Sequence, residues 1–92
     1  MTHETRMLVD GKLVDAEAAA TFAVVDPATG DEVGVVADGS HADMARAVAA
    51  ARRAADAGAW ATDPDLRRAC LAQLQGALEA EQEELRAELI TE

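Results

Sequence analysis

The sequence is poor in the residue types that build disulfides, membrane spans and metal sites. Its 92 residues include one cysteine, two aromatic residues and no tyrosine. A single cysteine excludes an internal disulfide framework and a cysteine-based structural zinc site. No apolar run approaches the roughly 18 residues that span a bilayer, and no apolar stretch follows the polar opening over residues 1–6. We therefore expect no membrane partner, no secretory signal and a cytoplasmic location.

Basic residues are also scarce. Eight lysines and arginines stand against 18 acidic residues, which gives a net charge of −10. Such a charge disfavours binding to nucleic acid or to an anionic membrane surface. The acids are concentrated in residues 1–40 and 79–92, so the middle of the chain is its least acidic part.

Alanine, in contrast, is abundant. Apolar residues make up 50% of the chain, and 23 of them are alanine. Alanine favours helix but buries little surface, so it contributes little to a core. A chain of this length buries only about 60–65% of its unfolded surface. We therefore expect the isolated chain to fold poorly or to associate.

Residues 6–37 have the pattern of two antiparallel hairpins. Asp10-Gly11 between apolar residues predicts a type I′ turn with strands at about 6–9 and 12–14. Strands at 21–25 and 32–37 flank a turn over 26–30. In that turn Asp26 can cap the backbone, and Gly30 allows a positive φ. Residues 15–20 between the hairpins are expected to form a linker.

The rest of the chain has the pattern of helices. Ser40 and Asp43 predict a capping box, Gly58 a helix end, and Asp63-Pro64 a new helix start. The predicted class is α+β, short antiparallel hairpins followed by two or three helices. The predicted organisation is one partial domain over 1–92, with a disordered N-terminus at 1–5, hairpins at 6–37, helices at 41–57 and 64–79, and at 81–91 a third helix or a continuation of the second.

No motif in the chain carries recognisable chemistry. Gly30 and Gly34 lack the spacing of a phosphate loop, and His3 and His41 have no third metal ligand at a suitable spacing. Cys70 falls on an apolar helix face, which predicts a buried structural thiol rather than a nucleophile. The acidic run 79–84 is interpreted as a solvated face. From these patterns we assign no catalytic and no cofactor-binding residue.

The order of local signatures nevertheless resembles the amino-terminal segment of the NAD(P)-dependent aldehyde dehydrogenase superfamily. The similar stretches are the Asp-Gly hairpin at 7–14, the strand and turn at 21–30, the strand at 32–37, the alanine-rich helix at 43–54, Trp60, the helix at 67–74, Glu84-Leu85 and Glu92. Each stretch is weak alone, but together they occur in the family's order over residues 7–92. Asp26 replaces the commoner asparagine before the proline, and Cys70 stands where an aliphatic residue is usual.

The resemblance implies a larger parent enzyme. That enzyme is an oxidoreductase that uses NAD or NADP to oxidise an aldehyde to a carboxylate through a cysteine thiohemiacetal. Its catalytic and cofactor-binding residues would lie downstream, so Cys70 is not its nucleophile and Glu92 is not its base. This segment would belong to an α/β Rossmann-like nucleotide-binding domain, with the remainder of the chain as its partner. The parent would be a homodimer or homotetramer, and the isolated 92-residue fragment would be inactive.

The resemblance also implies one metal contact. In several members the backbone carbonyl just before the Asn-Pro step helps to hold a structural monovalent cation. By position that carbonyl is the one of Val25, with Val24 as a neighbouring candidate.

Two other functions are weighed against the dehydrogenase fragment. An independent acidic α+β interaction module without catalysis fits the composition, and only the reading frame beyond Glu92 separates it from a fragment. An acyl-carrier protein fits less well, because Ser40 lies in Gly-Ser-His rather than Asp-Ser-Leu, and because residues 6–37 have strand character.

Overall fold

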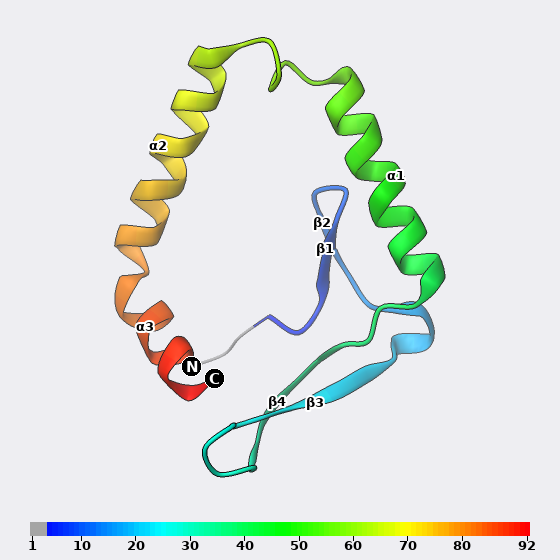
Figure 1. Ribbon diagram of the computed structural model, residues 1–92, viewed down its shortest axis with the longest axis vertical. Helices are drawn as coiled ribbons and strands as arrows, with labels where there is room; N and C mark the ends of the chain where they lie inside the picture. The colour runs from blue at the N-terminus through cyan, green and yellow to red at the C-terminus, as the bar shows by residue number, and fades with distance from the viewer. Residues whose placement is uncertain (1–3) are drawn as a thin grey trace.

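The computed structural model describes residues 4–92 and consists of two strand pairs followed by three helices (Figure 1). In chain order the elements are β1 (Met7–Val9), β2 (Lys12–Val14), a 3-10 turn (Glu17–Ala19), β3 (Thr21–Val25), β4 (Glu32–Ala37), α1 (His41–Ala57), α2 (Pro64–Ala80) and α3 (Gln82–Thr91). Both strand pairs are antiparallel, and each forms a separate two-stranded sheet. The predicted α+β class is confirmed.

The β1–β2 hairpin follows from its turn. Asp10 and Gly11 have φ values of 54° and 73°, the left-handed conformation that a type I′ turn requires at both central positions. This turn sets Met7 opposite Val14. The carboxylate of Asp10 also lies 3.4 Å from the guanidinium of Arg53, so an ion pair ties the hairpin tip to α1.

The β3–β4 hairpin contains a bulge. Its register runs from Thr21 opposite Ala37, through Val24 opposite Gly34, to Val25 opposite Glu32. Val33 is therefore an extra residue in β4, and an extra residue bends a strand and increases its twist. The turn forms as the sequence predicts, because Oδ1 of Asp26 accepts the N–H of Ala28 at 2.7 Å and Gly30 has a φ of 78°.

Specific contacts determine where α1 begins and where it ends. At the start, the Ser40 hydroxyl accepts the N–H of Asp43 at 3.1 Å, and the Asp43 carboxylate accepts the N–H of Ser40 at 2.9 Å. The predicted capping box is thus confirmed. At the end, Gly58 has an extended φ of −85°. A Cβ there would lie 2.6 Å from the carbonyl oxygen of Ala54, so the site needs glycine for space rather than for a positive φ.

The second and third helices form one arm with a break. The side chain of Asp63 accepts the N–H groups of Asp65 and Leu66, and Pro64 is the first helical residue. Glu81, with φ −108° and ψ 15°, leaves helical geometry and separates α2 from α3. Within residues 4–92, none of the helices combines the length and the apolar character needed to cross a membrane.

These elements surround no common core. Figure 1 shows α1, α2 and α3 as the sides of an open frame, with the β1–β2 hairpin beside α1 and the β3–β4 hairpin at the base. The dimensions are 47 × 35 × 18 Å and the radius of gyration is 16.5 Å, against about 12 Å for a compact chain of this length. Among residues 4–92 only Ala16, Asp43 and Ala50 are buried.

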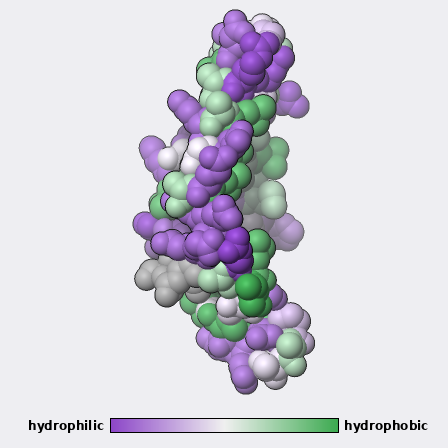
Figure 2. Space-filling model, turned by 90° about the vertical axis from the view of Figure 1, so that its left-hand side faces the viewer, coloured by the Kyte–Doolittle hydropathy of each residue, from purple (hydrophilic) through white to green (hydrophobic). Residues whose placement is uncertain are grey.

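Large apolar side chains instead remain on the surface. Those that are at least half exposed are Leu8, Phe22, Val25, Met44, Val48, Trp60, Leu71, Leu74, Leu89 and Ile90. Figure 2 shows hydrophobic atoms reaching the surface along the length of the molecule, on the side formed by the α2–α3 arm. Soluble monomers rarely leave so much apolar surface uncovered, so we expect a partner to cover these faces.

Residues 15–20, expected as a linker, contain the 3-10 turn, in which Ala18 and Ala19 have φ values of 59° and 54°. Of residues 1–5, expected to be disordered, residues 1–3 lie outside the described part of the chain. The carbonyl of Thr5 accepts the N–H of Ala37 at 2.9 Å.

Candidate functional site

Asp43 is the one charged side chain that is buried within residues 4–92, with 3% of its surface exposed. Its Oδ2 accepts the backbone N–H of Glu17 and the backbone N–H of Ser40, each at 2.9 Å. The guanidinium of Arg46, one turn along α1, pairs with Oδ1. Asp43 therefore joins the turn that follows the first hairpin to the start of α1, across 26 positions of sequence.

The Ser40 hydroxyl completes this junction. It lies 2.7 Å from Oε2 of Glu17, to which it donates a hydrogen bond. The same turn holds Ala18 and Ala19 in left-handed conformations, which cost an L-residue roughly 1–2 kcal/mol each. We call the group of Glu17, Ser40, Asp43 and Arg46 the Asp43 junction.

The environment of Asp43 favours its charged form. The N–H of Glu17 above all, and then the N–H of Ser40, lower the pKa of Asp43, while burial opposes them and Arg46 adds a smaller lowering. A general acid or base needs a pKa near the working pH. A carboxylate fixed in its ionised form by backbone donors therefore serves structure at neutral pH.

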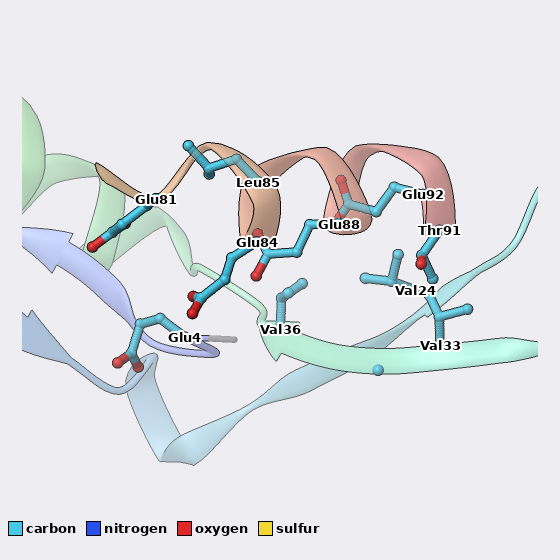
Figure 3. Close-up of a pocket in the computed structure, with 11 residues that line it drawn as sticks. Glu4, Val24, Val33, Val36, Glu81, Glu84, Leu85, Glu88, Thr91 and Glu92 are labelled. Carbon is cyan, nitrogen blue, oxygen red and sulfur yellow. The ribbon is translucent and has the colours of Figure 1, made fainter. Parts of the chain in front are cut away.

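A second feature is a cleft of about 610 Å³ between α3 and the β3–β4 hairpin (Figure 3). Its apolar lining is Val24, Val33, Gly34, Val36 and Leu85. Its polar lining is Glu4, Glu81, Glu84, Glu88, Thr91 and Glu92. Figure 3 shows Glu84 and Glu88 projecting from α3 toward the strand that carries Val33 and Val36. We call this the glutamate cleft.

One of its five carboxylates is neutralised within the chain. Oε1 of Glu4 lies 2.8 Å from Nε of Arg6 and also accepts the backbone N–H of Arg6. These bonds lower the pKa of Glu4 from 4.5 to about 2. The other four glutamates all lie within residues 81–92, so the cleft is strongly negative.

The residues singled out from the sequence do not come together in one site. Val25 ends β3 next to the bulge, and its side chain is half exposed. Cys70 is half-buried in the interior of α2, far from the helix start that would activate a thiol. His41 is an exposed residue at the start of α1, and His3 lies outside the described residues.

The glycines and glutamates considered from the sequence have other places. Gly30 lies in a hairpin turn and Gly34 within β4, so neither precedes a helix that could bind a phosphate. The acidic run 79–84 is exposed throughout, yet Glu81 and Glu84 line the glutamate cleft, as does Glu92. Within residues 4–92, no three histidine, cysteine or acidic side chains are arranged to hold a metal ion.

Sequence reasoning missed both the Asp43 junction and the glutamate cleft. The capping box predicted the contact between Ser40 and Asp43, but nothing near Glu17 in the sequence indicates its hydrogen bond to Asp43. The cleft joins valines of the second hairpin to glutamates some fifty positions later, and only the fold brings them together.

The comparisons of this chain with known proteins agree with one another. The model of the aldehyde dehydrogenase family matches residues 13–92. The chain is 43% identical over 63 residues to the mitochondrial benzaldehyde dehydrogenase of Antirrhinum majus, covering 68% of this chain and 12% of that protein. It is 36% identical over 83 residues to the NADP/NAD-dependent aldehyde dehydrogenase PuuC of Escherichia coli (strain K12), covering 89% of this chain and 17% of that protein. The chain thus spans less than a fifth of the length of these curated relatives.

Proposed function

Because the chain belongs to the aldehyde dehydrogenase family, we propose that it is the amino-terminal structural segment of an NAD(P)-dependent aldehyde dehydrogenase. One observation carries the proposal beyond family membership. Residues 4–92 form helices and hairpins without a common core, and ten of their large apolar side chains are at least half exposed. Such surfaces suit a piece that packs against the remainder of a longer chain, in the parent's Rossmann-like nucleotide-binding domain.

The proposed reaction belongs to the whole enzyme. It is the oxidation of an aldehyde to a carboxylate through a cysteine thiohemiacetal, with NAD or NADP as oxidant. Residues 4–92 do not fit a dinucleotide, because Gly30 and Gly34 serve a turn and a strand, and the lone Gly39 before α1 does not make a glycine-rich loop at a helix N-terminus. We therefore assign no step of the reaction to this chain.

We also propose that this chain supplies one backbone ligand to a cation site of the whole enzyme. The carbonyl of Val25 would be one ligand of a monovalent cation, and the rest of the enzyme would supply the others. The position is compatible with this role, because Val25 ends β3 beside the bulge rather than within a regular ladder. We also propose a homodimeric or homotetrameric parent and a cytoplasmic location.

The length of the natural product is the first test. An antibody raised against residues 1–92 should detect, in extracts of the source cells, a polypeptide several times heavier than 9.6 kDa. The reading frame should continue past the codon for Glu92 into the remainder of a dehydrogenase. A stop codon at that point, with only a 9.6 kDa product in the cell, would contradict the fragment and favour an independent interaction module.

Activity is the second test. The purified 92-residue chain, incubated with NAD or NADP and a panel of aldehydes, should produce no reduced nicotinamide, whereas the longer polypeptide should. Cys70→Ser is the matched control, because it removes the one thiol of the chain. It should leave the activity of the longer enzyme intact. Turnover by the short chain that Cys70→Ser abolishes would overturn the structural assignment.

A further inference from the structure

The glutamate cleft has an apolar lining that residues 4–92 leave open. Val24, Val33 and Val36 face it from the β3–β4 hairpin, and Leu85 lies on α3. All four are only half-buried. A volume of about 610 Å³ lies within the range of roughly 300–1,000 Å³ found for ligand pockets. It is therefore large enough for a few side chains of another segment.

The charge of the cleft is not balanced from within. Among residues 4–92, no basic side chain pairs with Glu81, Glu84, Glu88 or Glu92. The seven arginines already have partners in the chain. The pairs are Arg6 with Glu4, Arg46 with Asp43, Arg52 with Asp56, Arg53 with Asp10, Arg67 with the carbonyl of Trp60, Arg68 with Asp65, and Arg86 with Glu83. Lys12, the remaining basic residue, lies in the β1–β2 hairpin and does not line the cleft. A compensating positive charge would therefore come from outside residues 4–92.

We propose that the glutamate cleft receives a segment of the remainder of the enzyme that inserts apolar side chains against the valines and presents lysine or arginine side chains to Glu84 and Glu88. This inference rests on the proposed function, because it takes its occupant from the longer chain. Opposite charges on facing surfaces fix which segments meet and in what register. The cleft would thus select the docking segment, while the exposed leucines of α2 supply less specific apolar contact.

Two other occupants fit less well. A second copy of this chain brings a charge of −10 and arginines that are already paired, so its approach to an acidic cleft is repelled. A metal ion needs ligands that converge on one point, and no three acidic side chains within residues 4–92 do so. The carboxylates are instead spread along α3, which suits an extended partner.

Charge reversal in the longer enzyme is the first experiment. The double variant Glu84→Lys/Glu88→Lys reverses two charges of the cleft. The matched control Glu79→Lys/Glu83→Lys makes the same change at the same spacing, at residues that do not line it. The control also breaks the ion pair of Glu83 with Arg86, which biases the comparison against the proposal. We expect the cleft variant to lower the unfolding midpoint by more than twice the drop in the control. The excess should shrink in high salt, which screens charges. Equal drops in the two variants would overturn the proposal.

Charge neutralisation in the longer enzyme is the second experiment. The double variant Glu84→Gln/Glu88→Gln removes two charges of the cleft without reversing them, and Glu79→Gln/Glu83→Gln is its matched control. We expect the cleft variant to lower the unfolding midpoint by less than Glu84→Lys/Glu88→Lys does and by more than its own control. A neutral cleft variant at least as stable as the wild-type enzyme would count against the cleft.

The two experiments separate this inference from the proposed function. If a longer, active enzyme exists but the cleft variants behave like their controls, only the cleft inference fails. If cells contain only the 9.6 kDa product, the proposed function fails. The assignment of the occupant to the rest of the enzyme fails with it.

Discussion

The Asp43 junction and the α2–α3 arm are stabilised in different ways. The junction contains the buried Asp43, and hydrogen bonds there link positions 26 residues apart. The arm has no buried residue, and its caps and its ion pairs such as Arg68 with Asp65 connect neighbours within one helix. The junction thus has its partners within the chain, whereas the arm exposes a face that no other part of residues 4–92 covers. Five substitutions test this contrast, from the largest expected effect to the smallest.

Leu74→Ala should destabilise the longer enzyme much more than the isolated chain. In the longer enzyme, where we propose that the arm is covered, the loss of a buried leucine side chain costs about 2–5 kcal/mol of unfolding free energy. In the isolated chain Leu74 is more than half exposed, so the change should stay within about 0.5 kcal/mol. Denaturant unfolding of both forms measures the difference. A small effect in the longer enzyme would mean that this face remains in water.

Asp43→Asn should break the junction and remove its pH dependence. The pKa of Asp43 is lower in the folded chain than its usual value near 3.9, because its charged form accepts backbone N–H groups. Its stabilising effect is therefore complete above the usual pKa and is lost as the pH falls through the lowered one. Protection of the Glu17 amide from hydrogen exchange, relative to its intrinsic exchange rate at each pH, reports this loss between neutral and acid pH. The Asn variant should show little protection of this amide at any pH, and wild-type protection that is insensitive to acid would contradict the assignment.

Ser40→Ala and Asp63→Ala compare the two helix caps. Loss of an N-cap side chain costs about 0.5–2 kcal/mol. Ser40 should fall at the upper end, because its hydroxyl also bonds to Glu17, whereas Asp63 serves only the start of α2. Helical content and thermal unfolding of the two variants give the ranking. If Asp63→Ala were the more damaging change, the arm rather than the junction would hold the chain together.

Gly76→Ala should be mildly stabilising. Gly76 lies inside α2, and a Cβ there would meet no atom within 4 Å. Alanine is better than glycine in a helix interior by roughly 0.5–1 kcal/mol. The isolated chain should therefore gain helical signal in far-ultraviolet circular dichroism. A loss of stability in the longer enzyme alone would show that another segment approaches the backbone at this position.

The sequence predicted the features whose partners are near in the chain. The Asp10-Gly11 turn, the Ser40–Asp43 capping box and the Asp63-Pro64 helix start each depend on residues within a few positions. The α+β class followed from them. The family was also evident from the order of these local signatures.

Features whose partners are distant could not be predicted. Alanine does not favour a positive φ, so nothing local indicates the left-handed Ala18 and Ala19, which lie beside the residue that bonds to Asp43. The acidic run appeared to be a solvated face because the valines of β4 that approach α3 lie far away in sequence. A helix with a half-apolar face also gives the same pattern whether its partner is in the same chain or absent.

Hydrogen exchange of the α2–α3 amides tests most directly whether the arm depends on the remainder of the enzyme. We predict rapid exchange over residues 66–90 in the isolated 92-residue chain, with the slowest amides near Glu17 and the start of α1. In the longer enzyme the same arm should exchange orders of magnitude more slowly, because its apolar face is covered. Equal and strong protection of residues 66–90 in both forms would contradict this dependence and show that the chain is a self-sufficient domain.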